Sequence, residues 1–459
     1  MNIYEVIKSE TTGVLNNTAI VEAKRSLNYA QLFLLVEKLA HKLEVAGVKK
    51  YQRIALHCKD SIEYIILNLA ILKLNAVVVP VPYGASAHET KEVIKKIKAD
   101  FFIDWDKKEV GDLKNTQIPP LEYANLNPAF IRFSSGTTGA AKGVLLSHEA
   151  IIERTALANQ ALQINCADTV VWLLQMSFHF VVTILLFLRC GAKIVLCGND
   201  FPAGLAEGLK VHKVTFLYAS PFHYNLMAAS PLIEAAWLLR VRLAISTAAK
   251  LAVLESENFF KKFNFELNEA YGIIEVGLPF VNTSGDKNKR GSVGKLLPGY
   301  EIKLVDCDAQ GVGKILLKGK GMFNSYLSPW ALRDAVTKDG WFDTGDLGYL
   351  DGDGFLFIVG REKNLINFNG MKIFPAEVEA VINSYPEVKE SRVYAKAHPV
   401  HGEIPAAQIV LKDGQNNLQL DDLRRFIYKN IDKYKAPKEF EIVTEIPKTL
   451  SGKIKIIDK

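Results

Sequence analysis

Residues 133–143 read Phe-Ser-Ser-Gly-Thr-Thr-Gly-Ala-Ala-Lys-Gly, a run of hydroxyls and glycines with one lysine near its end. Glycines let a backbone turn tightly and bring N–H groups close to an anion, and hydroxyl and ammonium groups add further donors. The spacing differs from the G-x-x-x-x-G-K-[ST] pattern of P-loop proteins. The composition predicts another kind of polyphosphate-binding loop, with the candidate ligands Ser134, Ser135, Gly136, Thr137, Thr138, Gly139 and Lys142.

Apolar residues flank this loop on both sides, at residues 129–133 and 144–146. Short apolar runs of this kind predict buried strands, so we expect the loop to connect two strands. A helix is expected to begin only after Ser147, whose hydroxyl suits the N-cap position, with Glu149 in the first turn.

The composition indicates a globular protein of more than one domain. The chain has 459 residues, 49% of them hydrophobic and 23% charged, which is too long for one ordinary core. The net charge of +6 is mild, and lysine and arginine form no dense run. We therefore expect no nucleic-acid partner.

The five cysteines form no C-x-x-C pair, which predicts free, buried thiols in a reducing compartment. The first residues include an acidic side chain and no long apolar segment, so no secretory signal is expected. The apolar stretches 62–81 and 180–188 fall short of about 20 clean apolar residues, so we expect no membrane span. A cytoplasmic location is the resulting expectation.

Apolar runs alternate with helical patterns over the first two thirds of the chain, which predicts an α/β fold. Asn28 and Gln31 have the spacing of a capping box. After residue 299 short strands dominate and predict a small β subdomain over residues 300–360. Residues 361–459 predict a compact α+β domain with helices beginning at Pro375 and near Leu420. Buried strands are expected at residues 53–57, 76–81, 193–197 and 215–218.

Further motifs accompany the loop, and together they resemble the core motifs of the adenylate-forming superfamily of acyl-CoA synthetases, peptide-synthetase adenylation domains and luciferases. The motifs are Asn268-Glu-Ala-Tyr-Gly-Ile-Ile-Glu275, Trp341-Phe-Asp-Thr-Gly-Asp346, Gly360-Arg361 and Pro447-Lys-Thr-Leu-Ser-Gly-Lys453. The resemblance covers nearly the whole chain, although Ala141 stands where the family usually has proline. It implies a large N-terminal domain over residues 1–360 and a small mobile C-terminal domain over residues 361–459.

By this resemblance, Ala270, Tyr271 and Gly272 contact ATP and Glu275 binds Mg²⁺. A magnesium ion held together with phosphates needs only one or two protein carboxylates. The family's threonine, whose hydroxyl would reach the α-phosphate, is Ile274 here, so one donor is lost.

The resemblance also assigns residues nearer the C-terminus. Asp346 would accept hydrogen bonds from the ribose hydroxyls, and Arg361 would contact ribose and phosphate. Lys363 occupies the hinge position, and Gly370 would let a pantetheine arm pass the backbone. Lys453 takes the place of the catalytic lysine, which stabilises the negative charge that builds between the acid and the α-phosphate.

The stretch Met176-Ser-Phe-His-Phe180 falls near the aromatic and histidine motif that borders the family's acid pocket. His179 is a candidate catalytic residue, although a histidine among apolar residues is as often a satisfied core side chain. The stretch lacks an aspartate to hold an α-amine, which favours a plain carboxylic acid. The apolar surroundings favour a fatty or aryl acid, with the candidate lining residues Phe178, His179, Phe222, Ser246, Ala249 and Ile273.

The sequence therefore predicts an AMP-forming acid–thiol ligase that uses ATP and Mg²⁺ to make an acyl-adenylate and then acylates coenzyme A. Transfer to the phosphopantetheine of an acyl carrier protein stays open, because the attacking thiol is the same. A luciferase-like enzyme that stops at the adenylate or oxidises it has no positive support. A non-catalytic nucleotide-binding homologue is opposed by five motif residues that are all in register: Lys142, Glu275, Asp346, Arg361 and Lys453.

Overall fold

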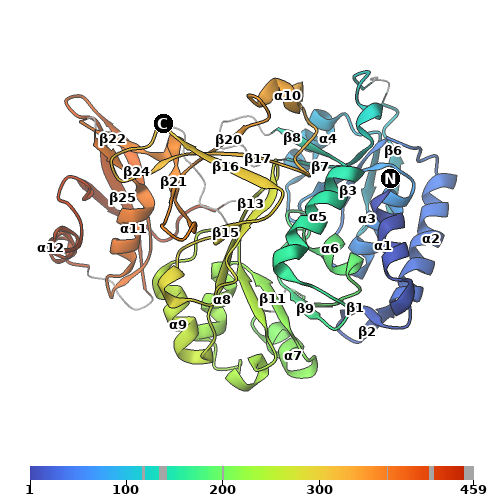
Figure 1. Ribbon diagram of the computed structural model, residues 1–459, viewed down its shortest axis with the longest axis horizontal. Coiled ribbons are helices and arrows are strands. Elements are labelled where there is room, and N and C mark those ends of the chain that lie inside the picture. Colours follow the sequence, from blue (N-terminus) through green and yellow to red (C-terminus); the bar gives the residue numbers. More distant parts are fainter. Residues whose placement is uncertain (116–118, 134–141, 199–200, 370, 413–417, 449–459) are drawn as a thin grey trace. The chain divides into compact units, whose positions relative to one another are not determined.

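The computed structural model describes residues 1–115, 119–133, 142–198, 201–369, 371–412 and 418–448 (Figure 1). The chain forms two compact units. Unit 1 comprises Met1–Glu301 and Leu317–Phe342, and unit 2 comprises Ile302–Leu316 and Asp343–Lys459. The domain boundary expected at residues 360 and 361 remains a prediction.

Unit 1 contains a nine-stranded sheet whose six central strands, β1, β10, β9, β11, β12 and β13, run parallel to one another. Antiparallel strands extend it at both edges. In spatial order the strands are β15 (Lys295–Leu296), β14 (Gly277–Val281), β13 (Asn268–Ile273), β12 (Leu243–Ser246), β11 (Phe216–Ala219), β9 (Thr169–Trp172), β10 (Lys193–Leu196), β1 (Thr18–Glu22) and β2 (Arg25–Asn28).

The second sheet of unit 1 has eight strands, of which β7, β4, β3 and β5 are parallel. Strand β8 returns antiparallel to β7 and pairs on its other side with β18. In spatial order the strands are β19 (Trp330–Leu332), β18 (Ser325–Leu327), β8 (Gly143–Ser147), β7 (Pro128–Phe133), β4 (Val77–Val81), β3 (Arg53–His57), β5 (Phe101–Asp104) and β6 (Glu109–Asp112).

Helices cover both sheets, as parallel strands require. Helices α7 (Ala203–Val211), α8 (Pro221–Ala229) and α9 (Val253–Phe263) pack on one face of the nine-stranded sheet, and α4 (Ala87–Ile97) packs on one face of the eight-stranded sheet. Helices α3 (Ile62–Lys73) and α5 (His148–Leu162) contact strands of both sheets. Ten residues of α3 are buried, as expected of a helix enclosed on all sides.

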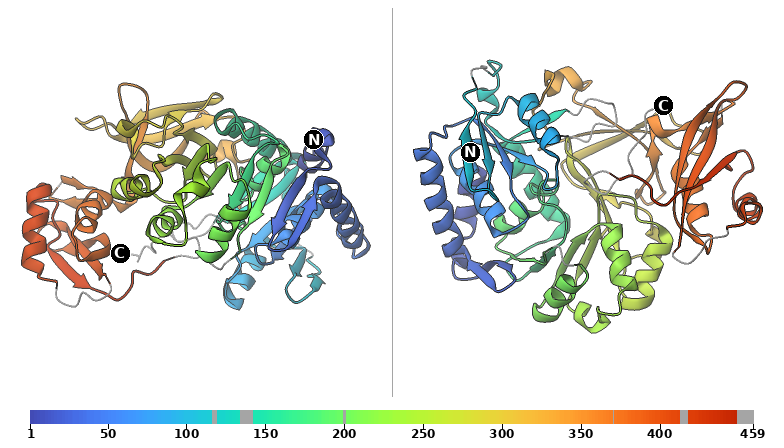
Figure 2. Two further views of the ribbon diagram at one scale, coloured as in Figure 1. Left: turned by 90° about the horizontal axis from the view of Figure 1, so that it is seen from below. Right: turned by 180° about the vertical axis from the view of Figure 1, so that it is seen from behind.

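The remaining helices of unit 1 are α1 (Ile3–Glu10), α2 (Tyr29–Val45), α6 (Ile184–Arg189) and α10 (Arg333–Val336). Figure 2 shows α1 and α2 in blue, and α2 packs against α3. The predicted capping box of α2 is confirmed, because the Asn28 side chain accepts from the Gln31 N–H and the Gln31 side chain accepts from the Asn28 N–H. The predicted N-cap Ser147 is also confirmed.

Unit 2 holds a second, smaller α/β assembly. A four-stranded sheet, most of whose residues belong to unit 2, has the order β16 (Tyr300–Val305), β17 (Gly313–Gly319), β20 (Phe342–Leu350) and β21 (Leu356–Arg361). A five-stranded sheet packs against α11 (Pro375–Asn383) and α12 (Leu420–Asn430) around one apolar core; its strands are β23 (Met371–Ile373), β22 (Ile366–Phe368), β25 (Gly402–Leu411), β24 (Val388–His398) and β26 (Glu439–Ile442). The predicted α/β class is confirmed, as is the expectation that short strands dominate directly after residue 299.

The cysteines are free, as predicted, but the expectation that all are buried is wrong. Only Cys58 is buried, whereas Cys166 and Cys307 are exposed. Both exposed cysteines lie in segments between elements, where apolar periodicity carries no information about burial.

Replacing Asn28 with alanine should destabilise unit 1, because the first turn of α2 would lose a side-chain acceptor. We expect a loss of about 1 kcal/mol, the usual cost of removing an N-cap side chain, measured as the free energy of unfolding in urea. Asn28→Ser keeps a capping oxygen and should lose much less. Equal losses for both variants would contradict this role for the cap.

Candidate active site

The carboxyl ends of parallel strands gather the predicted acid-pocket residues at one edge of the nine-stranded sheet, where open α/β sheets usually bind ligands. Phe178 and His179 follow β9, and Phe222 follows β11 in the first turn of α8. Ser246 ends β12, and Ile273 ends β13. Ala249 follows Ser246 by three residues.

These residues differ in exposure. Ser246 is buried, and its hydroxyl has no hydrogen-bond partner in the described part of the chain. Phe222 is 64% exposed, and Ala249 is exposed as well. The N–H groups of Phe178 and His179 both donate to the Gln175 carbonyl at 3.1 Å, so a tight turn orients this pair. Their roles in binding an acid remain predictions.

Lys142 immediately precedes β8 and is the last residue of the predicted phosphate loop. Loop residues 134–139 fall outside the described residues, so their predicted role is carried by the sequence alone. The Lys142 ammonium nitrogen lies 4.7 Å from the ring centre of Tyr326. Tyr326 belongs to β18 and pairs with Val144 of β8, which places its ring beside the end of the loop.

Glu275 lies in the turn between β13 and β14 and contacts the hydroxyl of the same tyrosine. The Tyr326 hydroxyl donates to the Glu275 carboxylate at 3.2 Å, and the Phe323 N–H donates to the Glu275 carbonyl at 2.7 Å. Burial and the nearby carboxylate raise the pKa of Tyr326 well above its usual value, so the hydroxyl stays protonated and remains a donor. Tyr326, which the sequence did not indicate, therefore links Lys142 to Glu275.

The predicted nucleotide-contacting strand is tightly packed. A Cβ atom at Gly272 would lie 2.4 Å from the Gly277 carbonyl oxygen, so only glycine fits there. The Tyr271 ring lies 6.3 Å from that of Phe280 on the paired strand. Ala270 of the same strand is buried and pairs with Val281.

Arg154 of α5 holds two loops of this region. Its Nη1 donates to the Ile274 carbonyl at 3.1 Å, and its Nε donates to the Gly321 carbonyl at 2.9 Å. The residue is buried, and burial lowers its pKa to about 10, which leaves it charged at neutral pH. The first loop leads into Glu275 and the second leads to Tyr326, so Arg154 fixes the separation of that pair.

Two further contacts join the edges of the two sheets. The Asp60 carboxylate, in the loop after β3, accepts from the Met176 N–H at 3.1 Å. Arg132 of β7 donates through Nη1 to the Phe178 carbonyl. Both contacts anchor the segment that holds the predicted acid-pocket pair. Neither Asp60 nor Arg132 belongs to a recognised motif, so no pattern in the sequence indicates these two residues.

In unit 2 the predicted ribose-binding pair is adjacent. Asp346 of β20 lies opposite Arg361 of β21, and the Arg361 Nε lies 3.0 Å from the Asp346 carboxylate. Thr344 supports the turn before Asp346, since its hydroxyl donates to the Ile315 carbonyl and accepts from the Asp346 N–H. Lys363 lies in a single 3₁₀ turn after β21. Gly370 and Lys453 fall outside the described residues.

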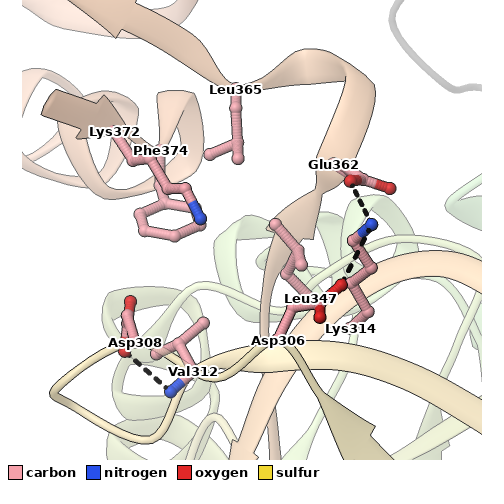
Figure 3. A pocket seen from close by; sticks show the side chains of 9 residues that line it. All are labelled: Asp306, Asp308, Val312, Lys314, Leu347, Glu362, Leu365, Lys372 and Phe374. Carbon is pink, nitrogen blue, oxygen red and sulfur yellow. Dashed lines mark hydrogen bonds and ion pairs between the residues drawn. The ribbon is translucent and has the colours of Figure 1, made fainter. Parts of the chain in front are cut away.

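A small cavity of about 80 Å³ lies beside this 3₁₀ turn (Figure 3). Lys314 forms ion pairs there with Glu362 at 2.8 Å and with Asp306 at 3.4 Å. The cavity is too small for a nucleotide, and Lys314 is already paired with carboxylates. Its lining residues are Asp306, Asp308, Val312, Lys314, Leu347, Glu362, Leu365, Lys372 and Phe374.

No helix in the described ranges has the length and apolar character needed to cross a bilayer. The same ranges contain no group of three or more His, Cys, Asp or Glu side chains placed to hold a metal ion.

Comparison with known proteins identifies the family. Residues 9–327 match the family model described as AMP-binding enzyme, and residues 377–453 match the model described as AMP-binding enzyme C-terminal domain. The chain belongs to the AMP-binding enzyme family, and the predicted membership of the adenylate-forming superfamily is confirmed.

The curated relatives include three ligases. 4-Coumarate–CoA ligase 3 of Oryza sativa subsp. japonica is 32% identical over 70% of this chain and 61% of its own length, so this match spans less than two thirds of that relative. 2-Succinylbenzoate–CoA ligase of Listeria innocua is 29% identical over 95% of this chain and 94% of its own length. Indoleacetate–CoA ligase of Aromatoleum aromaticum is 27% identical over 95% and 93%.

Solved structures confirm the fold. ATP-bound MatB from Rhodopseudomonas palustris superposes with a TM-score of 0.86 at 23% identity, covering 99% of this chain and 97% of that chain. o-Succinylbenzoate CoA synthetase from Bacillus subtilis, in complex with its acyl-adenylate intermediate, gives a TM-score of 0.84 at 23% identity over the same shares of the two chains.

Asp60→Asn should stabilise the protein in a pH-dependent way. Burial raises the folded pKa of Asp60 from 3.8 to about 7, so the folded state holds this proton more tightly than the unfolded state does. The ionised carboxylate therefore lowers stability progressively as the pH rises from about 4 to about 7. Asparagine keeps an oxygen acceptor for Met176 and removes this cost, so the gain in Tm should be larger at pH 8 than at pH 5.

Glu63→Gln is the matched control, because that carboxylate pairs with Arg25 and its folded pKa is lowered by this contact despite partial burial. The control should lose stability at pH 8. An Asp60→Asn gain of equal size at both pH values would show that the buried charge is not the cause.

Proposed function

We propose that this protein activates an aryl carboxylic acid with ATP and transfers the acyl group to the thiol of coenzyme A. The observation that best supports this proposal is the meeting of Lys142 and Glu275 on Tyr326, which joins a phosphate-loop cation to a candidate metal carboxylate. The names of the relatives favour an aryl acid over a fatty acid, since three of them are ligases for 4-coumarate, indoleacetate and 2-succinylbenzoate.

In the first step, a carboxylate oxygen of the acid attacks the α-phosphorus of ATP and the P–O bond to pyrophosphate breaks. Little covalent chemistry falls to the protein, so positioning and charge stabilisation carry the catalysis. Lys142 and the donors of residues 134–139 bind the departing pyrophosphate. Lys453, assigned by resemblance, stabilises the charge between the carboxylate and the α-phosphate.

Glu275 fits a magnesium ion that arrives with the nucleotide. Glu275 is partly exposed, and the hydrogen bond from the Tyr326 hydroxyl uses one of its oxygen lone pairs. Mg²⁺ at nucleotide sites takes one or two carboxylates, phosphate oxygens and water. When bound, the ion neutralises phosphate charge.

In the second step, the sulfur of the thiol attacks the acyl carbon, the bond to AMP breaks, and the thiol proton is released. Rotation of the C-terminal domain about Lys363 withdraws Lys453 and brings the segment around Gly370 to the site. Motions of this kind often limit turnover. An acyl carrier protein presents the same phosphopantetheine sulfur, so the acceptor is decided by experiment.

ATP–pyrophosphate exchange without any thiol tests the adenylation step. We expect exchange with aryl acids to exceed exchange with amino acids at least about tenfold, because discrimination of about 1.4 kcal/mol already gives that factor. Adding coenzyme A or a holo carrier protein then reveals the acceptor through thioester formation. Silence across aryl, fatty and amino acids, with ATP binding intact, would overturn the proposal in favour of a non-catalytic homologue.

Lys453→Ala should lower the exchange rate about 100-fold or more, the usual effect of removing one group that stabilises transition-state charge. ATP affinity, measured by calorimetry, should change little, because Lys142 and Glu275 stay in place. Lys455→Ala removes a lysine from the same terminal segment and should leave exchange nearly unchanged. If both variants behave alike, Lys453 is not the catalytic lysine.

A further inference from the structure

Arg132 faces the space between the two sheets of unit 1. It follows Ile131, whose side chain belongs to the apolar core beneath α4, and successive residues of a strand point to opposite faces. Phe130, on the same face as Arg132, stacks on Phe180 with ring centres 6.3 Å apart. The Arg132 guanidinium therefore points toward the segment after β9 that carries Phe178.

Within the described part of the chain, the hydrogen bonds of Arg132 do not use all of its N–H donors. Nη1 donates to the Phe178 carbonyl, while the buried Nε has no hydrogen-bond partner. A guanidinium carries five N–H donors, and enclosing them without acceptors costs free energy. The residue as a whole keeps part of its surface exposed.

Charged side chains of both signs surround Arg132. Burial lowers the pKa of both Arg132 and Arg154 only to about 10, so both are cations at neutral pH, and the field of Glu275 acts on both. Arg154 is occupied by the carbonyls of Gly321 and Ile274. Lys142 adds a third cation, while the Glu275 carboxylate and the Glu153 carboxylate, which accepts from the Gly321 N–H, supply negative charge.

We propose that Arg132 is an oxyanion-binding residue of this site. Its planar guanidinium can take two oxygens of one carboxylate or phosphate group side by side. The oxyanion is either the carboxylate of the acid or a phosphate of ATP, and this assignment rests on the proposed function. Arg132 thereby supplies donors that Ile274, without a hydroxyl, does not.

The test compares Arg132→Met, which keeps much of the side-chain length without charge, with Arg132→Lys, which keeps the charge without the planar fork. Calorimetry measures the Kd of ATP, and then the Kd of the acid on protein saturated with a non-hydrolysable ATP analogue. If Arg132 binds phosphate, Arg132→Met should raise the Kd of ATP about tenfold or more, as expected for a lost charged hydrogen bond of about 1.5–3 kcal/mol. If it binds the acid, the Kd of the acid should rise instead.

Arg132→Lys should recover part of the lost affinity for the same ligand and for that ligand only. Arg25→Met is the matched control, since it removes an arginine whose partner, Glu63, lies outside this site, and it should leave both Kd values unchanged. If Arg132→Met folds and both of its Kd values lie within twofold of wild type, the proposal is overturned. If Arg132→Met does not fold, the same result for a folded Arg132→Lys protein overturns it. Because these readouts are binding constants, exchange by the wild type tests the proposed function separately.

Discussion

One buried guanidinium constrains the whole candidate site. Arg154 donates from α5 to the carbonyls of Ile274 and Gly321, 120 and 167 residues away along the chain. A buried cation without acceptors would cost several kcal/mol, so both loops are held where their carbonyls can reach it. Glu275 and Tyr326 follow those loops closely, and the contact between them depends on this arrangement.

The fold turns that local constraint into a site. In both sheets of unit 1 the parallel strands end at one edge, so the loops that carry polar side chains gather there. The bonds from Asp60 to Met176, from Arg132 to Phe178 and from Tyr326 to Glu275 connect the two edges. None lies within a single helix or strand, so the apolar packing of both sheets sets the geometry.

The charges gathered at these edges suit a substrate that brings its own negative charge. Adenylation builds charge on phosphoryl oxygens, and fixed cations stabilise such charge without having to reorganise during the reaction. In unit 2 the pairing of β20 with β21 alone brings Asp346 and Arg361 together. The predicted ribose-binding pair is therefore brought together by one hairpin, whereas the contacts of the candidate site in unit 1 need two sheets.

The sequence by itself determined the features that depend on neighbouring residues. The capping box of Asn28 and Gln31, the N-cap Ser147, the buried strands and the spacing of the motifs around Glu275 and Asp346 all follow from patterns a few residues long. Such patterns also identified the family, because its motifs are local. They did not show that Phe222 is exposed, since the period of a helix does not reveal whether another element covers it.

Only the tertiary structure decided the parts that Arg132, Tyr326 and Asp60 play. Their partners are 46, 51 and 116 residues distant in the chain, and no periodicity reaches so far. In the sequence, nothing distinguishes an arginine before a loop, a tyrosine in a short strand or an aspartate after a strand from ordinary residues. Their roles depend on the tertiary structure, because buried polar groups need hydrogen-bond partners and the packing of the two sheets determines which groups lie within reach.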